Sequence, residues 1–116
     1  MKEISIAFYD TKPYDKDSFI QMNKNFGFHI DFFDFHLNEK TAFSSKGYNV
    51  VCAFVNDVID ENVIKILKQN NVELIAMRCA GYNNIDLNAA EVAGLKIVRV
   101  PAYSPNAVAE HAVAIL

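Results

Sequence analysis

Short apolar runs alternate along this chain with longer segments in which apolar and polar residues recur at helical spacing. The apolar runs include residues 4–9, 50–55 and 74–79, and the last two are apolar almost throughout. Continuous apolar runs of this length are typical of parallel strands that are covered on both faces. The alternation therefore predicts an α/β protein with a doubly wound parallel sheet and helices on both faces.

Five strands are expected, over residues 4–9, 29–35, 50–55, 74–79 and 96–100. The second of these alternates polar and apolar residues, which favours a strand near the sheet edge. Its expected buried side chains are Ile30, Phe32, Phe33 and Phe35. Residues 38–45 are expected to form a short helical turn.

Acidic residues mark the starts of the connecting helices, because an aspartate side chain caps the first free amides of a helix. The expected caps are Asp15 or Asp17 for a helix to about residue 25, Asp57 or Asp60 for the next helix, and Asp86 for the third. The second helix should bury a stripe of Val63, Ile66 and Leu67, and Gly94 should end the third. A last helix should begin near Pro105.

Composition excludes several classes of function. A chain of 116 residues with 52% hydrophobic residues suits one globular domain, and a net charge of −3 offers no basic field for nucleic acid. No apolar run approaches the roughly 20 residues that cross a bilayer, and no secretory signal is present. We therefore expect a cytoplasmic protein with reduced thiols at Cys52 and Cys79 and, because no ligand spacing is seen, no metal.

Two segments after strands carry the candidate chemistry. After the fourth strand, the turn containing Ala80 and Gly81 lets backbone amides face a small carboxylate. The competing interpretation is a plain turn between strand and helix, with Asp86 as the cap of the helix. After the fifth strand, two prolines hold Tyr103, which either donates a hydrogen bond at this edge or packs its ring there with its hydroxyl in water.

Both segments together resemble the substrate-side signature of the D-2-hydroxyacid dehydrogenases, most closely the fermentative D-lactate dehydrogenases. The matching blocks are residues 78–86, Arg-Cys-Ala-Gly-Tyr-Asn-Asn-Ile-Asp, and residues 100–112, which begin Val-Pro-Ala-Tyr-Ser-Pro-Asn. The resemblance implies a flavodoxin-like substrate domain over residues 1–103. It also implies that residues 104–116 begin the crossover helix to an NAD-binding Rossmann domain.

The same resemblance assigns roles to individual residues. The amides of Ala80 and Gly81 would hold the carboxylate of a 2-keto or 2-hydroxy acid, and Tyr103 would line the pocket. Asn106 and Val108 would face the cleft where the nicotinamide lies. Arg78 would either assist carboxylate binding or form a structural ion pair. The complete enzyme would be a homo-oligomer that uses NAD, and it would act on pyruvate or a bulkier 2-keto acid. The residues that distinguish NAD from NADP are expected outside these 116 residues.

The chain is expected to lack the catalytic residues themselves. The final apolar helix has no stop signal, so we interpret Leu116 as an artificial or premature end; the alternative is a small complete domain whose last helix packs on the sheet. No glycine-rich dinucleotide fingerprint is present, and in the resembling family the catalytic histidine, its acid partner and the clamping arginine come later in the chain. Neighbouring Glu110 and His111 point about 100° apart on a helix and do not form a catalytic pair. His29 and His36 are expected at the surface. The isolated chain should be inactive.

Two other classes of function compete with the dehydrogenase hypothesis. A flavodoxin-like or receiver-like binding module is one, with Asp10 and Asp57 as available acids, but it lacks the acidic pair, the late lysine and a glycine-rich first turn. The other is a domain used for assembly, through apolar residues of the terminal helix.

Overall fold

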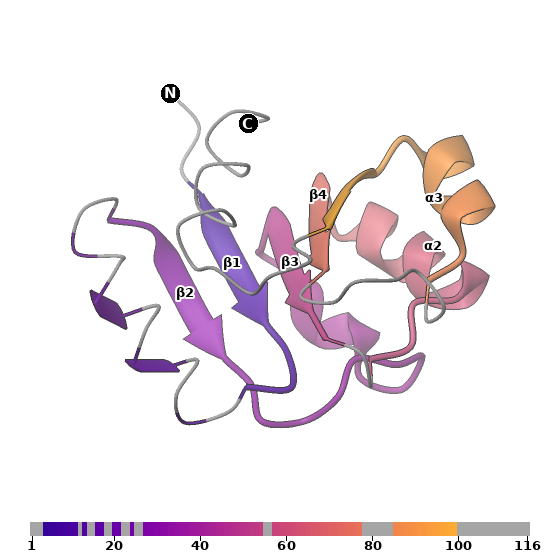
Figure 1. The fold of residues 1–116 in the computed structure, drawn as a ribbon. Helices are drawn as coiled ribbons and strands as arrows, with labels where there is room; N and C mark the ends of the chain where they lie inside the picture. The colour runs from indigo at the N-terminus through magenta and orange to yellow at the C-terminus, as the bar shows by residue number, and fades with distance from the viewer. Residues whose placement is uncertain are drawn as a thin grey trace.

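A five-stranded parallel sheet forms the centre of the molecule (Figure 1). The computed structural model describes residues 4–11, 13, 16–17, 20–21, 24, 27–54, 57–77 and 85–99. The strands are β1 (Ser5–Phe8), β2 (His29–Phe32), β3 (Val50–Ala53), β4 (Leu74–Met77) and β5 (Lys96–Arg99). Their order, β2-β1-β3-β4-β5, is that of flavodoxin-like folds and confirms the predicted α/β class.

Alternate side chains of the strands pack into two separate cores, one on each face of the sheet. In β1, Ala7 belongs to the core on one face, and Ile6 and Phe8 belong to the core on the other. All four residues of β3 and all four of β4 are buried, as expected for central parallel strands. The continuous apolar runs of the sequence therefore correspond to strands that are covered on both sides.

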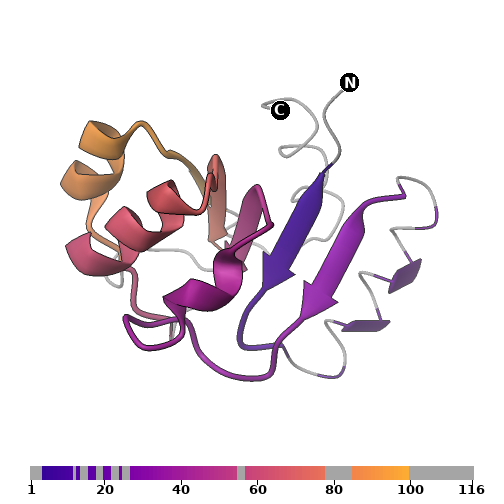
Figure 2. The same ribbon diagram turned by 180° about the vertical axis from the view of Figure 1, so that it is seen from behind.

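Two helices and a 3-10 turn cover the first face. They are α2 (Glu61–Gln69), α3 (Leu87–Ala93) and η1 (Ala42–Ser45), the last of which confirms the predicted helical turn. Figure 2 shows these three elements gathered on the β3 and β4 side, with β1 and β2 clear of them. On the second face, Ile20 and Lys24 line a groove with Ile30 and Phe32 of β2.

Capping side chains define the helix limits that the sequence predicted. The Asp60 carboxylate accepts the Val63 amide at 3.0 Å at the start of α2. Asp86 does the same for the Ala89 amide, also at 3.0 Å, at the start of α3. Gly94 ends α3 with a φ of 77°, a left-handed conformation that glycine adopts without strain.

The buried stripe of α2 differs from the prediction at one position. Val63 and Leu67 are fully buried, as expected, but their neighbour is Ile64, and Ile66 is only partly buried. A helix face about 100° wide admits residues at spacings of three and four, so positions 63, 64 and 67 share it. Ile66 lies at the margin of that face.

The second strand lies at the sheet edge, as predicted, but it is shorter than expected. It ends at Phe32, and a bend follows at Asp34 and Phe35. Phe35 was predicted to be buried and is instead 38% exposed, because the alternation of strand side chains no longer applies beyond the bend. Its ring stacks on Phe33, with the centroids 4.9 Å apart.

A polar cluster covers the beginning of this edge strand. The Tyr48 hydroxyl donates to Oδ2 of Asp31, and Nε2 of His29 lies 2.9 Å from the same oxygen. The hydrogen bond from Tyr48 lowers the pKa of the Asp31 carboxyl. Burial, together with this hydrogen bond and the Asp31 charge, raises the pKa of Tyr48 to about 12. Charged side chains of this kind discourage edge-to-edge pairing of sheets.

Leu67→Ala should destabilise the domain strongly. Removing a fully buried leucine side chain leaves a cavity beneath the helix, so the free energy of unfolding should fall by about 2–5 kcal/mol in urea titrations. Val92→Ala on α3 is the matched control, because Val92 is 90% exposed and its loss should change stability by no more than about 0.5 kcal/mol. Equal effects of the two variants would contradict this packing.

Tyr48→Phe should change how stability depends on alkaline pH. The folded chain holds the Tyr48 proton more tightly than the unfolded chain, so this stabilisation is complete below about pH 10 and is lost as the pH rises through 12. At neutral pH the variant should be less stable by about 0.5–1 kcal/mol, since Asp31 is partly exposed. Unfolding curves of both proteins should converge between pH 10 and 12. A constant difference across that interval would contradict the assignment.

Candidate functional site

The carboxyl edge of the sheet is where open parallel α/β proteins bind their ligands. Strands β4 and β5 pair in register up to their last residues, so Met77 lies opposite Arg99. The chain continues from these two positions into the two segments that carry the predicted chemistry. The predicted site residues, Ala80, Gly81, Tyr103, Asn106 and Val108, lie outside the described residues, as does Arg78, for which two roles were left open.

Both ends of the segment 78–84 are anchored in the core. Met77 precedes the segment and is fully buried, and Ile85 follows it and is 8% exposed. Ile85 forms a parallel bridge with Ile59, and the Asp86 amide donates to the Ile59 carbonyl at 2.9 Å. The chain therefore leaves the sheet after Met77 and is bonded again at Ile85 to the connection between β3 and α2.

A buried carboxylate, Asp57, lies in that connection, and sequence reasoning did not find its role. Its Oδ1 accepts the Leu37 amide at 2.7 Å, and its Oδ2 accepts the Phe54 amide at 2.6 Å. The sequence offers both Asp57 and Asp60 as caps of the second helix, but Asp60 is the N-cap of α2, and Asp57 instead joins two loops. Its partner Leu37 is twenty positions away, so no local pattern signals the contact.

A second acidic residue, Asp10, follows β1 at the same edge. It is 1% exposed, and its backbone adopts a left-handed φ of 51°. The His36 ring approaches it, with Nε2 at 3.3 Å from Oδ1. His36 is half exposed and His29 is also at the surface, as predicted.

The Tyr9 ring lies in the core on the face covered by α2 and α3, and it is near enough to Asp57 to feel its charge. Its hydroxyl and Oγ of Ser44 are 2.7 Å apart. Burial raises the pKa of Tyr9, and the negative charge of Asp57 raises it further, against the lowering effect of the Ser44 hydrogen bond. The phenol therefore stays neutral at physiological pH and serves packing.

These carboxylates divide the edge into two electrostatic regions. Asp10 follows β1 and Asp57 follows β3, so negative charge gathers near these strands. The edge strand β2, with His36 beyond its end, is three strand spacings from β4, or about 14 Å. A substrate carboxylate is therefore disfavoured after β1, where Asp10 is buried.

The turn after β1 does not fit a dinucleotide. A Rossmann site needs glycines there, so that the backbone can approach the pyrophosphate at a helix N-terminus. This turn instead carries the buried Asp10, whose charge opposes a phosphate. The described residues also contain no group of three or more His, Cys, Asp or Glu side chains that could hold a metal ion. Within the same residues, no helix has the length and apolar character to span a membrane.

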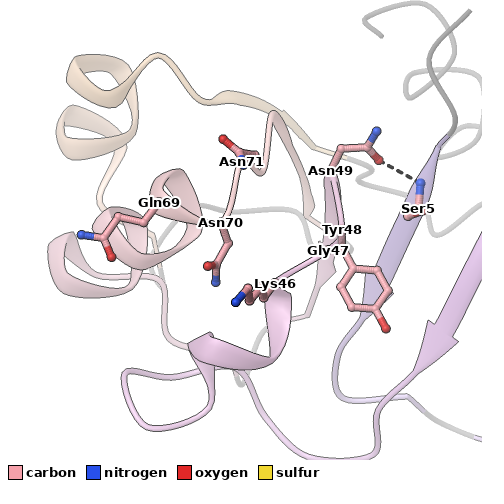
Figure 3. A pocket seen from close by; sticks show the side chains of 8 residues that line it. All are labelled: Ser5, Lys46, Gly47, Tyr48, Asn49, Gln69, Asn70 and Asn71. Carbon is pink, nitrogen blue, oxygen red and sulfur yellow. Dashed lines mark hydrogen bonds between the residues drawn. The ribbon is translucent and has the colours of Figure 1, made fainter.

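A groove of about 500 Å³ lies at the opposite, amino-terminal edge of the sheet (Figure 3). Its described lining is polar and consists of Ser5, Lys46, Gly47, Tyr48, Asn49, Gln69, Asn70 and Asn71. Helix α2 ends at this groove, and the negative end of a helix dipole disfavours an anion. Although it is a sizeable hollow, it is poorly suited to a carboxylate substrate.

Comparison with known proteins links these observations to one family. Residues 6–114 match the model of the D-isomer specific 2-hydroxyacid dehydrogenase catalytic domain. The chain is 53% identical over 113 residues to D-lactate dehydrogenase of Escherichia coli strain K12, a match that covers 97% of this chain and 34% of that protein. The chain thus spans about a third of the length of this relative.

Solved structures agree with this similarity. The apo structure of D-lactate dehydrogenase from Escherichia coli superposes with a TM-score of 0.83 at 54% identity, covering 96% of this chain and 35% of that one. A D-isomer specific 2-hydroxyacid dehydrogenase from Lactobacillus delbrueckii ssp. bulgaricus, in its NAD complexed form, gives a TM-score of 0.78 at 27% identity. That match covers 95% of this chain and 34% of the other.

Proposed function

The chain belongs to the D-isomer specific 2-hydroxyacid dehydrogenase family, and we propose that it forms the substrate-binding side of an NAD-dependent D-lactate dehydrogenase. The in-register pairing of β4 and β5 up to Met77 and Arg99 is the observation that carries the proposal. It starts both signature segments from neighbouring strands at the edge where such folds bind ligands. The complete enzyme would reduce pyruvate to D-lactate.

In this proposal the chain binds and orients the 2-keto acid. The backbone amides of Ala80 and Gly81 donate to its carboxylate, and Tyr103, from the neighbouring segment, lines the same pocket. Two amides suit the two oxygens of a carboxylate, and glycine lets the ligand approach the backbone closely. Asp10 follows β1, two strand spacings from β4, and its negative charge disfavours an anion on that side of the edge.

The cofactor is assigned mainly to residues outside this chain. NAD supplies the hydride chemistry when bound, and the turn after β1 does not fit it. We therefore propose that the region that the longer relatives carry beyond the match holds NAD, with Asn106 and Val108 facing it. Proton transfer to the substrate oxygen is likewise assigned to that region, and no catalytic residue is placed in this chain.

The receiver-like alternative is disfavoured by the burial of Asp57. A phosphate-accepting aspartate must be reached by its phosphodonor. Asp57 has no exposed surface, and backbone amides occupy both of its carboxylate oxygens. Asp10 is also buried. Neither acid is available for the phosphotransfer chemistry that such a module requires.

Activity should require more than these 116 residues. The purified 116-residue chain should not oxidise NADH in the presence of pyruvate. Most of the cofactor site, and the group that transfers the proton, are assigned to residues outside this chain. A polypeptide that continues with the region present in the relatives should do so. The loss of NADH absorbance measures the activity of the short chain and of the longer polypeptide. Turnover by the short chain, or none by the long polypeptide with any 2-keto acid, would contradict the proposal.

Tyr103→Phe in the complete enzyme should weaken substrate binding. Loss of one hydroxyl hydrogen bond is worth about 1 kcal/mol, so the KM for pyruvate should rise roughly five- to tenfold while the KM for NADH changes little. Tyr48→Phe is the control, because it removes a tyrosine hydroxyl that donates to Asp31 on the edge strand. It should leave the KM for pyruvate and the KM for NADH unchanged. Equal behaviour of the two variants would remove Tyr103 from the pocket.

A further inference from the structure

The carboxylate of Asp57 links two loops at the carboxyl edge of the sheet. Each of its oxygens accepts a backbone amide, one from Leu37 beyond β2 and one from Phe54 at the end of β3. Its side chain is completely buried, so these bonds are needed to offset the desolvation of the charge. A buried charge with both oxygens bonded to backbone amides holds those loops in one arrangement.

Further backbone contacts connect the residues after Asp57 with Ile85 and Asp86, which follow the segment 78–84. The next residue, Val58, donates its amide to the Leu37 carbonyl at 2.7 Å. Ile59 then forms the parallel bridge to Ile85 and accepts the Asp86 amide at 2.9 Å. The backbone that Asp57 holds is therefore the backbone to which the end of the segment 78–84 is attached.

We propose that Asp57 is a positioning residue for substrate binding, acting through residues 57–59 on the return of the segment 78–84. This inference rests on the proposed function, in which that segment holds the substrate carboxylate. One end of the segment is set by β4, which pairs in register with β3 and β5. The other end depends on the connection fixed by Asp57. Displacements of about 1 Å in a binding site reduce catalysis up to roughly a hundredfold.

Asp57→Asn is the variant that tests this role. The amide keeps one acceptor oxygen, but its NH₂ group would face the amide of Leu37 or Phe54, so one of the two bonds is lost. Asp60→Asn is the matched control, because Asp60 lies three residues away, accepts one backbone amide, and asparagine caps helices equally well.

The experiment measures kinetic constants of the complete enzyme. For Asp57→Asn we expect the KM for pyruvate to rise at least tenfold, with the KM for NADH within twofold of the wild type. Asp60→Asn should leave both within twofold. A purely structural role would lower the melting temperature without separating the two KM values. A folded Asp57→Asn enzyme with an unchanged KM for pyruvate would overturn the proposal.

Two further measurements keep the inference testable if that variant does not fold or the enzyme proves not to reduce 2-keto acids. Ile85→Ala disturbs the other side of the bridge between Ile59 and Ile85 and should raise the KM for pyruvate in the same way. An unchanged KM would overturn the proposal.

Hydrogen exchange of the Asp86 amide measures how firmly this amide is bonded to the Ile59 carbonyl, and it requires no enzyme activity. It should accelerate at least tenfold in Asp57→Asn relative to Asp60→Asn. Unchanged exchange would overturn the anchoring, whereas an inactive wild type with accelerated exchange would overturn only the proposed function.

Discussion

The parallel, in-register pairing of the strands is the constraint on which the rest of the structure depends. Because every strand runs in the same direction, every connection after a strand starts from one edge, and the last residues of β3, β4 and β5 lie side by side. Full burial of β3 and β4 holds this register, since a slip of one residue would exchange the side chains of the two faces. Segments twenty residues apart in sequence are thereby brought to one place.

Buried carboxylates lie at the same edge, and each of them needs hydrogen-bond or charged partners nearby. Asp57 accepts two backbone amides, and Asp10 lies against His36. These contacts join the loops after β1, β2 and β3 into one frame, to which the segment after β4 returns at Ile85. A site in such a position gains precision from the frame rather than from its own loop, which is how rigid scaffolds commonly support binding segments.

Local sequence signals predicted the fold well because they act over a few residues. Asp60, Asp86 and Gly94 mark helix limits through contacts within three or four positions. Signals failed where the partner is distant. The bonds from the Leu37 amide to Asp57 and from the Tyr48 hydroxyl to Asp31 span 20 and 17 positions, and no spacing rule reports them. Phe35 was misplaced because the bend that ends β2 interrupts the alternation from which its burial was predicted.

The candidate site was predicted from a different kind of signal. The resemblance of two blocks to one family predicts Ala80, Gly81 and Tyr103 as site residues, and the register of β4 and β5 starts both blocks from neighbouring strands. Physical reasoning on the residues left a plain turn as the competing interpretation for the first block. The distinction depends on where an anion binds, which neither composition nor periodicity encodes.

A crystal structure of the proposed complete enzyme with oxamate, a carbonyl-containing carboxylate analogue of pyruvate, tests the central claim most directly. We expect the oxamate carboxylate to accept hydrogen bonds from the amides of Ala80 and Gly81, beyond the end of β4. Oxamate bound beside Asp10 and His36, or in the polar groove at the amino-terminal edge, would contradict it.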